Sequence, residues 1–205
     1  MGEIFLAINL NAPSAGRNLM GEMTDPADRL YERVQVLRAQ AGDATAFADL
    51  VGRYHARLHY YLGKIIARPN SVEDVLQDVW LDVWRGLPRL RDAAAFPAWL
   101  YRVARDRAVR THRLPPPPRP LELDDVVSDP DDTDEFTAED AARVHAALDN
   151  LAPEFREVLV LRFLEEMAYA DIARVVDCPI GTVRSRLHHA KLALRRQLER
   201  TMTRD

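Results

Sequence analysis

The most regular pattern of apolar and polar positions lies near the C-terminus, in residues 169–198. In its second half the apolar residues recur at spacings of 4, 3 and 4, as on one face of a helix: Val183, Leu187, Ala190 and Leu194. A shorter one-face set precedes it: Ile172, Ala173 and Val176. Between the sets, Asp177 can take the left-handed conformation that ends a helix, and Pro179 suits the start of another. The pattern predicts two helices joined by a tight turn.

Turning that apolar stripe inward leaves basic and hydroxyl-bearing residues on the outer side of the second helix, with Ser185, His188 and Arg196 facing outward. Recognition of base edges in a major groove uses such forked donors and hydroxyls. Residues 179–200 hold six basic residues and one acidic residue. A surface helix with solvated arginines is the alternative, but the preceding helix and short turn favour DNA recognition. The candidate DNA-contacting residues are Thr182, Arg184, Ser185, Arg186, His188, His189 and Arg196.

Helical periodicity also runs through residues 29–113, with breaks at Gly42, at 68–71 and at 86–88. Residues 1–28 have no sustained period, which predicts a disordered leader or a true start that lies later in the sequence. These observations predict a first helical domain over residues 29–113.

Residues 114–135 differ in kind from the helical segments. Five prolines between positions 115 and 120 disfavour a helix, and residues 120–135 hold eight acidic residues and no basic one. This composition predicts a flexible, acidic, Pro-rich linker. A second helical domain over 136–200 opens with Thr137 and Asp140 as a capping pair, and a helix starts at Pro153. Its expected apolar face is Ala141, Val144, Leu148, Leu151, Phe155, Val158, Leu159 and Phe163. The predicted fold class is all-α, with two small domains.

The helix expected over residues 71–85 has two contrasting sides. Its expected buried side is Val72, Leu76, Val79, Trp80 and Val83. The opposite side carries Asp74, Gln77, Asp78, Leu81 and Arg85. A leucine among carboxylates and an amide is typical of a protein-binding face, although an ordinary acidic surface with one exposed leucine fits equally well.

The next helical segment is strongly basic. Residues 85–113 hold eight arginines against two aspartates, a local charge of +6 in a chain whose net charge is −4. Phe96, Leu100 and Val103 continue a core stripe, and the arginines fall on other faces. A cationic helix beside aromatic rings suits single-stranded DNA. The candidate residues here are Arg102, Asp106, Arg107 and Arg110.

Four segments stand out in order along the chain: GDATAFADLVGRY, SVEDVLQDVWLDVWR, FPAWLYRVARDRAV and DIARVVDCPIGTVRSRLHHAKLALRRQL. Together they resemble the extracytoplasmic-function (ECF) class of bacterial RNA polymerase sigma factors, within the sigma-70 family. The likeness spans about residues 34–198 and implies a sigma region 2 domain followed by a region 4 domain with a helix-turn-helix. It implies a protein that binds core RNA polymerase and directs promoter recognition and transcription initiation.

The resemblance also assigns roles to the candidate residues. It implies polymerase binding at the clamp helices of the largest subunit by Asp74, Gln77, Asp78 and Leu81. It implies contacts with the −10 element by Arg102, Asp106, Arg107 and Arg110, and with the −35 element by the residues named above on the last helix. The family usually has Asn where this chain has Asp106, which alters the expected −10 preference. Ala168 stands where Ser or Thr usually caps a helix, a loss of roughly 1 kcal/mol.

Further partners implied by the resemblance are the polymerase β flap, promoter DNA and, as a candidate, a cognate anti-sigma factor. A cytoplasmic protein at the bacterial nucleoid is expected, without cofactor, metal or catalytic residue. Cys178 is the single cysteine, which excludes an internal disulfide, and no apolar run approaches the ~18 residues of a membrane span. His55 and His59 lack the intervening glutamate of a zinc protease motif. A free-standing helix-turn-helix regulator and a DNA recombinase remain the alternatives.

Overall fold

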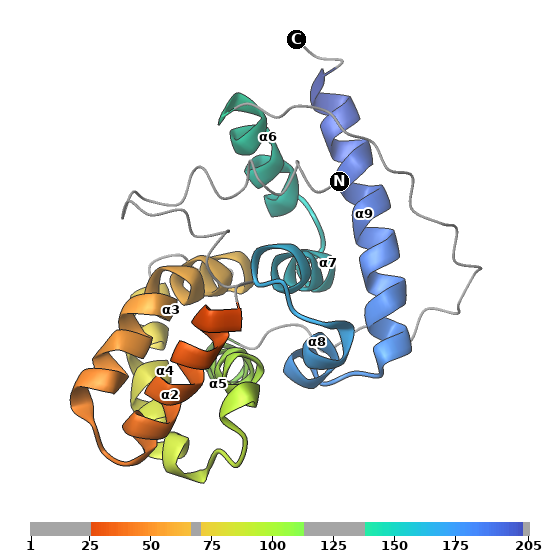
Figure 1. The fold of residues 1–205 in the computed structure, drawn as a ribbon. Helices are drawn as coiled ribbons and strands as arrows, with labels where there is room; N and C mark the ends of the chain where they lie inside the picture. The colour runs from red at the N-terminus through yellow and green to blue at the C-terminus, as the bar shows by residue number, and fades with distance from the viewer. Residues whose placement is uncertain (1–25, 67–70, 113–137, 203–205) are drawn as a thin grey trace. The chain divides into compact units, whose positions relative to one another are not determined.

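The computed structural model describes residues 26–66, 71–112 and 138–202 (Figure 1). Its first unit contains α2 (Pro26–Gln40), α3 (Ala44–Ile65), α4 (Val72–Gly86), η2 (Leu87–Arg89), η3 (Ala93–Ala95) and α5 (Phe96–His112). Its second is built mainly on α6 (Ala138–Asp149), α7 (Pro153–Leu159), η4 (Val160–Leu164), α8 (Tyr169–Val176) and α9 (Ile180–Met202). The predicted all-α class with two domains is confirmed. The leader up to residue 25, the linker at 114–135 and the capping residue Thr137 lie outside the described residues.

The first unit starts earlier than predicted, because α2 begins at Pro26 and not at Arg29. The first turn of α2 is tied to α3 by Asp28, whose Oδ2 accepts a hydrogen bond of 3.3 Å from Nη1 of Arg53. The guanidinium of Arg53 also lies 5.1 Å from the ring centroid of Tyr31. These contacts join residues that are far apart in the sequence, so periodicity could not place the start of the helix.

The predicted break at Gly42 separates α2 from α3. Gly42 has a φ of +92°, a conformation that a side chain disfavours. Asp43 then caps α3, since its carboxylate accepts hydrogen bonds from the backbone N–H groups of Thr45 at 2.9 Å and Ala46 at 3.1 Å. These backbone bonds, with the Arg38 guanidinium, lower the pKa of Asp43. The turn therefore combines a glycine, which tolerates the positive φ, with an aspartate that caps the first backbone N–H groups of α3.

Aromatic pairs fill the core of the first unit. Tyr54 meets Phe96 edge to face at 5.7 Å, and Tyr61 meets Tyr101 at 5.1 Å. All four rings are at most 1% exposed. Since these pairs link α3 to α5, they fix how the basic helix sits on its own unit.

The break predicted at 86–88 is confirmed as the end of α4, which runs through Gly86 before the short turn η2. A side chain at Gly86 would meet the ring of Trp99 at 2.9 Å, so the indole needs a glycine beneath it. The expected burial of Trp80 and Val103 is incomplete, because both are half-buried. Each lies at the edge of the packed side of its helix, because the apolar stripe is wider than the surface that the neighbouring helices cover.

The buried face of α7 differs from the predicted one. Val158 and Leu159 are fully buried as expected, but Phe155 and Phe163 are only half-buried. η4, which follows, is a π-helical turn with Val160 and Leu161 buried instead. A π-turn holds more residues than an α-turn, so within η4 the inward positions shift from Phe163 to Val160 and Leu161; Phe155 lies before this turn, and the shift does not explain its exposure. A prediction based on 3.6 residues per turn therefore fails at this point.

Candidate functional site

The turn between α8 and α9 has the predicted backbone. Asp177 is left-handed, with φ 51° and ψ 55°, and its N–H donates to the carbonyl of Ala173. The carbonyl of Pro179 accepts a 3.2 Å hydrogen bond from the N–H of Val183 and so opens α9. Ala168 stands at the start of α8 without a side-chain cap. The helix-turn-helix is thus held by backbone bonds and packing, with the expected cap missing.

The predicted inner stripe of α9 is confirmed, since each of its four members is at most 2% exposed: Val183, Leu187, Ala190 and Leu194. The expectation that Ser185 and Arg186 are exposed is wrong, since they are 9% and 3% exposed. α9 packs against both α6 and α7, so its buried arc is wider than one stripe, and Arg186 lies about 40° from Ala190 at its edge. Ser185 has a short side chain that reaches little beyond the helix backbone. Nη2 of Arg186 has no hydrogen-bond partner among the described residues.

The remaining predicted residues of α9 do reach the surface. Arg184 and Arg196 are exposed, and Thr182, His188 and His189 are half-buried. The ring of His189 stacks on Phe155 of α7, at 6.4 Å between centroids and 27° between planes, and His188 meets His189 edge to face at 5.5 Å. Phe155 was expected only as a core residue. Its half-buried ring instead orients the histidines, a role that sequence spacing did not indicate.

The predicted partner-binding side of α4 is exposed. Asp74 and Gln77 are exposed, the side chain of Asp78 is 50% exposed, and Leu81 is 51% exposed. Trp84 was missed by the sequence analysis, although it lies three residues after Leu81 and is 41% exposed. Its ring packs edge to face on Phe47 of α3 at 4.8 Å. The spacing of 77, 81 and 84 was the signal that could have found it.

The basic side of α5 is more paired than expected. Arg102, Asp106 and Arg110 are exposed, but Nε of Arg102 lies 4.0 Å from Oδ2 of Asp106. Nε of Arg110 donates to the backbone carbonyl of Asp106 at 3.1 Å. Asp106 therefore lies between two guanidinium groups on the surface of the helix.

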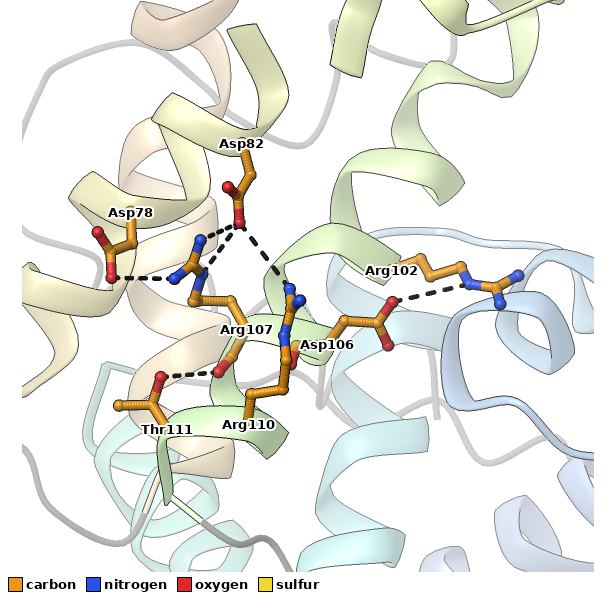
Figure 2. Close-up of polar contacts among 7 residues, drawn as sticks. All are labelled: Asp78, Asp82, Arg102, Asp106, Arg107, Arg110 and Thr111. Atoms are coloured by element: carbon orange, nitrogen blue, oxygen red, sulfur yellow. Dashed lines mark hydrogen bonds and ion pairs between the residues drawn. The ribbon is translucent and has the colours of Figure 1, made fainter. Parts of the chain in front are cut away.

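Arg107 is held between α5 and α4 (Figure 2). Its Nε donates to Oδ2 of Asp82 at 3.0 Å, its Nη2 makes a second bond to the same oxygen, and its Nη1 donates to Oδ2 of Asp78 at 3.3 Å. The hydrogen bond to Asp82 is the main reason that the pKa of Arg107 is raised. Arg107 is therefore bound to carboxylates of α4, and the predicted polymerase-binding and −10 residues meet in one network.

Asp82 was not among the predicted site residues. Its Oδ2 also lies 3.9 Å from Nη2 of Arg110, so one carboxylate serves two arginines of α5. In sequence, Asp82 is an acidic residue one turn after Asp78 and resembles other solvated carboxylates of α4. Its partners lie 25 and 28 positions away, so only the packing of α4 on α5 identifies it.

No group of three histidine, cysteine or carboxylate side chains within the described ranges is arranged to hold a metal ion. His59 pairs instead with Glu73, at 3.8 Å. None of the helices in the described parts is both long and apolar enough to cross a membrane.

Residues 50–114 match the family model of sigma-70 region 2, and residues 141–194 match that of sigma-70 region 4. The ECF RNA polymerase sigma-E factor of Haemophilus influenzae is 30% identical, over 86% of this chain and all of the relative.

Two solved structures are similar in fold. The structure of CnrH in complex with the cytosolic domain of CnrY has a TM-score of 0.61 and 24% identity, over 82% of this chain and 97% of that one. The sigma factor RpoE in complex with the anti-sigma factor NepR from Bartonella quintana has a TM-score of 0.54 and 21% identity, over 75% of this chain and 96% of that one.

Proposed function

Because the chain belongs to the ECF sigma factors of the sigma-70 family, and so directs transcription initiation, we propose that three helices divide the work. α9 reads the −35 element, α5 contacts the −10 element, and α4 binds core RNA polymerase. The observation that carries this assignment is the presence in one chain of a cationic helix-turn-helix and of a second exposed face that mixes carboxylates with large apolar groups.

On α9, the exposed guanidinium of Arg184 is suited to a guanine edge. His188 and His189 would lie beside it, with their rings oriented by Phe155. Thr182 would meet the DNA backbone near the start of the helix, and Arg196 would meet a phosphate farther along. Ser185 would support this surface from a nearly buried position, and Arg186 would not contact bases in the described conformation.

On α5, the exposed heads of Arg102 and Arg110 would contact the backbone of the opened −10 strand. Asp106 lies next to both of them, with its carboxylate 4.0 Å from Arg102 and its backbone carbonyl bonded to Arg110. A carboxylate accepts hydrogen bonds but cannot donate them. We therefore expect this chain to prefer −10 bases that offer an amino group to Asp106.

On α4, Leu81 and Trp84 offer apolar area within a ring of polar groups formed by Asp74, Gln77 and Asp78. Such a composition is typical of the energetic centre of a protein interface. The proposed partner is the pair of clamp helices of the largest polymerase subunit, which would present cations to the carboxylates.

Asp74→Arg tests this face, because Asp74 is exposed and lies outside the Arg107 network. A reversed charge against a cationic partner should cost several kcal/mol, or roughly a hundredfold or more in affinity for core polymerase. Glu73→Gln, which changes an exposed acidic neighbour on the same helix, is the matched control. Equal co-purification of the Arg variant and the wild type with core would refute the proposed face.

Further partners follow from the family assignment. The second unit would dock on the polymerase β flap, and a cognate anti-sigma factor would hold the chain away from polymerase. The sigma factor RpoE from Bartonella quintana is solved in complex with its own anti-sigma factor, NepR. We place the protein in the cytoplasm, at the nucleoid. As a sigma factor it is regulatory, and we propose that it has no catalytic residue and needs no cofactor.

In vitro transcription tests the function as a whole. The purified chain, core polymerase and a genomic template should yield transcripts with defined start sites that appear only when the chain is present. Sequence-specific DNA binding by the chain alone, with no new transcripts in the presence of core, would identify a free-standing helix-turn-helix regulator instead.

A further inference from the structure

One side chain belongs to both of the surfaces of the first unit that are assigned above. Asp78 lies on the exposed face of α4, with its side chain 50% exposed, and its Oδ2 also accepts a hydrogen bond from Arg107 of α5 at 3.3 Å. A polymerase cation that binds Asp78 therefore meets a carboxylate already paired within the chain. The strength of that internal pair must affect the affinity for polymerase.

Asp82 decides how strong that pair is. Its Oδ2 accepts hydrogen bonds from both Nε and Nη2 of Arg107, whereas Asp78 accepts one only from Nη1 (Figure 2). The side chains of Arg107 and Asp82 are 26% and 25% exposed, so solvent screens their bond less than that of Asp78. Asp82 therefore anchors Arg107 and leaves Asp78 only loosely engaged.

The same oxygen of Asp82 faces a second arginine. Nη2 of Arg110 lies 3.9 Å away, and the Arg110 side chain is 66% exposed on the surface assigned to the −10 element. The carboxylate thus partly offsets the positive charge that α5 presents. Its loss would strengthen the attraction of Arg110 to phosphates and leave its position less defined.

We propose that Asp82 is a positioning residue that couples polymerase binding on α4 to DNA binding on α5. It limits how strongly Arg107 competes for Asp78, and it moderates the charge of Arg110. This inference rests on the proposed function of the two faces. No other carboxylate among the described residues forms an ion pair with both arginines.

Four variants of the full chain test the coupling: Asp82→Asn, Asp82→Glu, Arg107→Gln and the Asp82→Asn/Arg107→Gln pair. Two quantities are measured for each. The first is affinity for core polymerase. The second is the salt dependence with which the holoenzyme binds a DNA fork carrying the −10 strand. Glu73→Gln is the matched control, since Glu73 is an exposed carboxylate of α4 outside the network, 3.8 Å from His59.

Asp82→Asn should weaken core binding by about two- to fivefold, because Arg107 then turns to Asp78 as its remaining carboxylate. It should also steepen the log-log salt slope of −10 binding by about one, because Arg110 has lost its nearby anion. Adding Arg107→Gln should restore core binding but leave the slope steep. Asp82→Glu should restore both quantities, and Glu73→Gln should change neither.

The proposal is overturned if Asp82→Asn folds and either binds core like the wild type or keeps the wild-type salt slope. It is also overturned if adding Arg107→Gln to Asp82→Asn does not restore core binding. If Asp82→Asn melts below the assay temperature, the Arg107→Gln single variant tests the proposal instead. It removes the competitor for Asp78 and should tighten core binding, whereas unchanged or weaker binding would contradict the coupling. A wild-type chain that binds no core at all would instead refute the proposed function.

Discussion

The helices assigned to promoter DNA, α5 and α9, carry their arginines in different settings. On α5, Arg102, Arg107 and Arg110 each form an ion pair with an aspartate. On α9, Arg184 and Arg196 are exposed, and neither has an ion pair with another described residue. The arginines of α5 are thus partly neutralised by carboxylates of their own unit, whereas Arg184 and Arg196 of α9 are open to a ligand.

This contrast indicates different uses of the same side chain. An unpaired guanidinium can give all of its donors to a base or a phosphate, so its loss should appear mainly in DNA binding. A guanidinium held by two carboxylates must exchange partners before it binds DNA, so its loss should appear first in stability and in the neighbouring surface.

Of the two DNA-contacting helices, α9 should show the larger effect. Arg184→Ala should cost roughly 1 to 3 kcal/mol of promoter binding and should alter the preference at particular −35 positions, because a forked donor to a base edge is lost. Transcription from a library of −35 variants measures both. Leu192→Ala is the control, since Leu192 is 40% exposed on the same helix and has no polar group. An equal loss at every promoter would show that Arg184 contacts only the backbone.

The second effect is on α5 and concerns stability. Arg107→Ala should lower the free energy of unfolding by roughly 1 to 2 kcal/mol, because Asp82 and Asp78 lose their shared partner. Arg184→Ala should change it by less than about 0.5 kcal/mol. Denaturant unfolding of both variants, with a double-mutant cycle between Arg107→Ala and Asp82→Ala, provides the measurement. Additive effects in that cycle would mean that the Arg107–Asp82 pair contributes nothing to the free energy of unfolding.

A smaller effect is expected at the far end of α9. Arg196→Ala should weaken binding to all promoters alike and flatten the log-log salt slope by about one unit, because one phosphate contact disappears. Holoenzyme binding to one promoter at several salt concentrations gives the slope. A changed sequence preference would place Arg196 on a base and move the reading face along the helix.

The smallest expected effect concerns Glu32, a buried carboxylate, in contrast to the ion-paired carboxylates of α4. Burial raises the pKa of Glu32 above its ordinary value of 4.5, although the hydroxyl of Tyr54 donates to it at 2.5 Å. The stability due to Glu32 is therefore fully present below the unfolded value and is lost as the pH rises through the folded one. Glu32→Gln should be slightly more stable than the wild type at pH 7, and the advantage should shrink or reverse near pH 4. Melting temperatures at both pH values check this, and a constant difference would contradict it.

The sequence by itself determined the features that depend on neighbouring residues. The spacing from Val183 to Leu194 located the inner side of α9, Asp177 indicated the left-handed turn, and Gly42 marked the break after α2. Leu81 among acidic residues indicated an exposed face on α4. Each follows from helix periodicity or from the backbone preference of one residue, which act within a turn or two of helix.

Tertiary structure decided what depends on residues far apart in the chain. Asp82 resembles any solvated carboxylate until α5 places Arg107 beside it, and Phe155 resembles a core residue until it stacks on His189. Arg186 is a surface cation by pattern, but packing of α6 and α7 on α9 widens the buried arc around it. Charge pairing and burial are properties of the assembled helices, and periodicity within one helix carries no information about which side chains its neighbours bring.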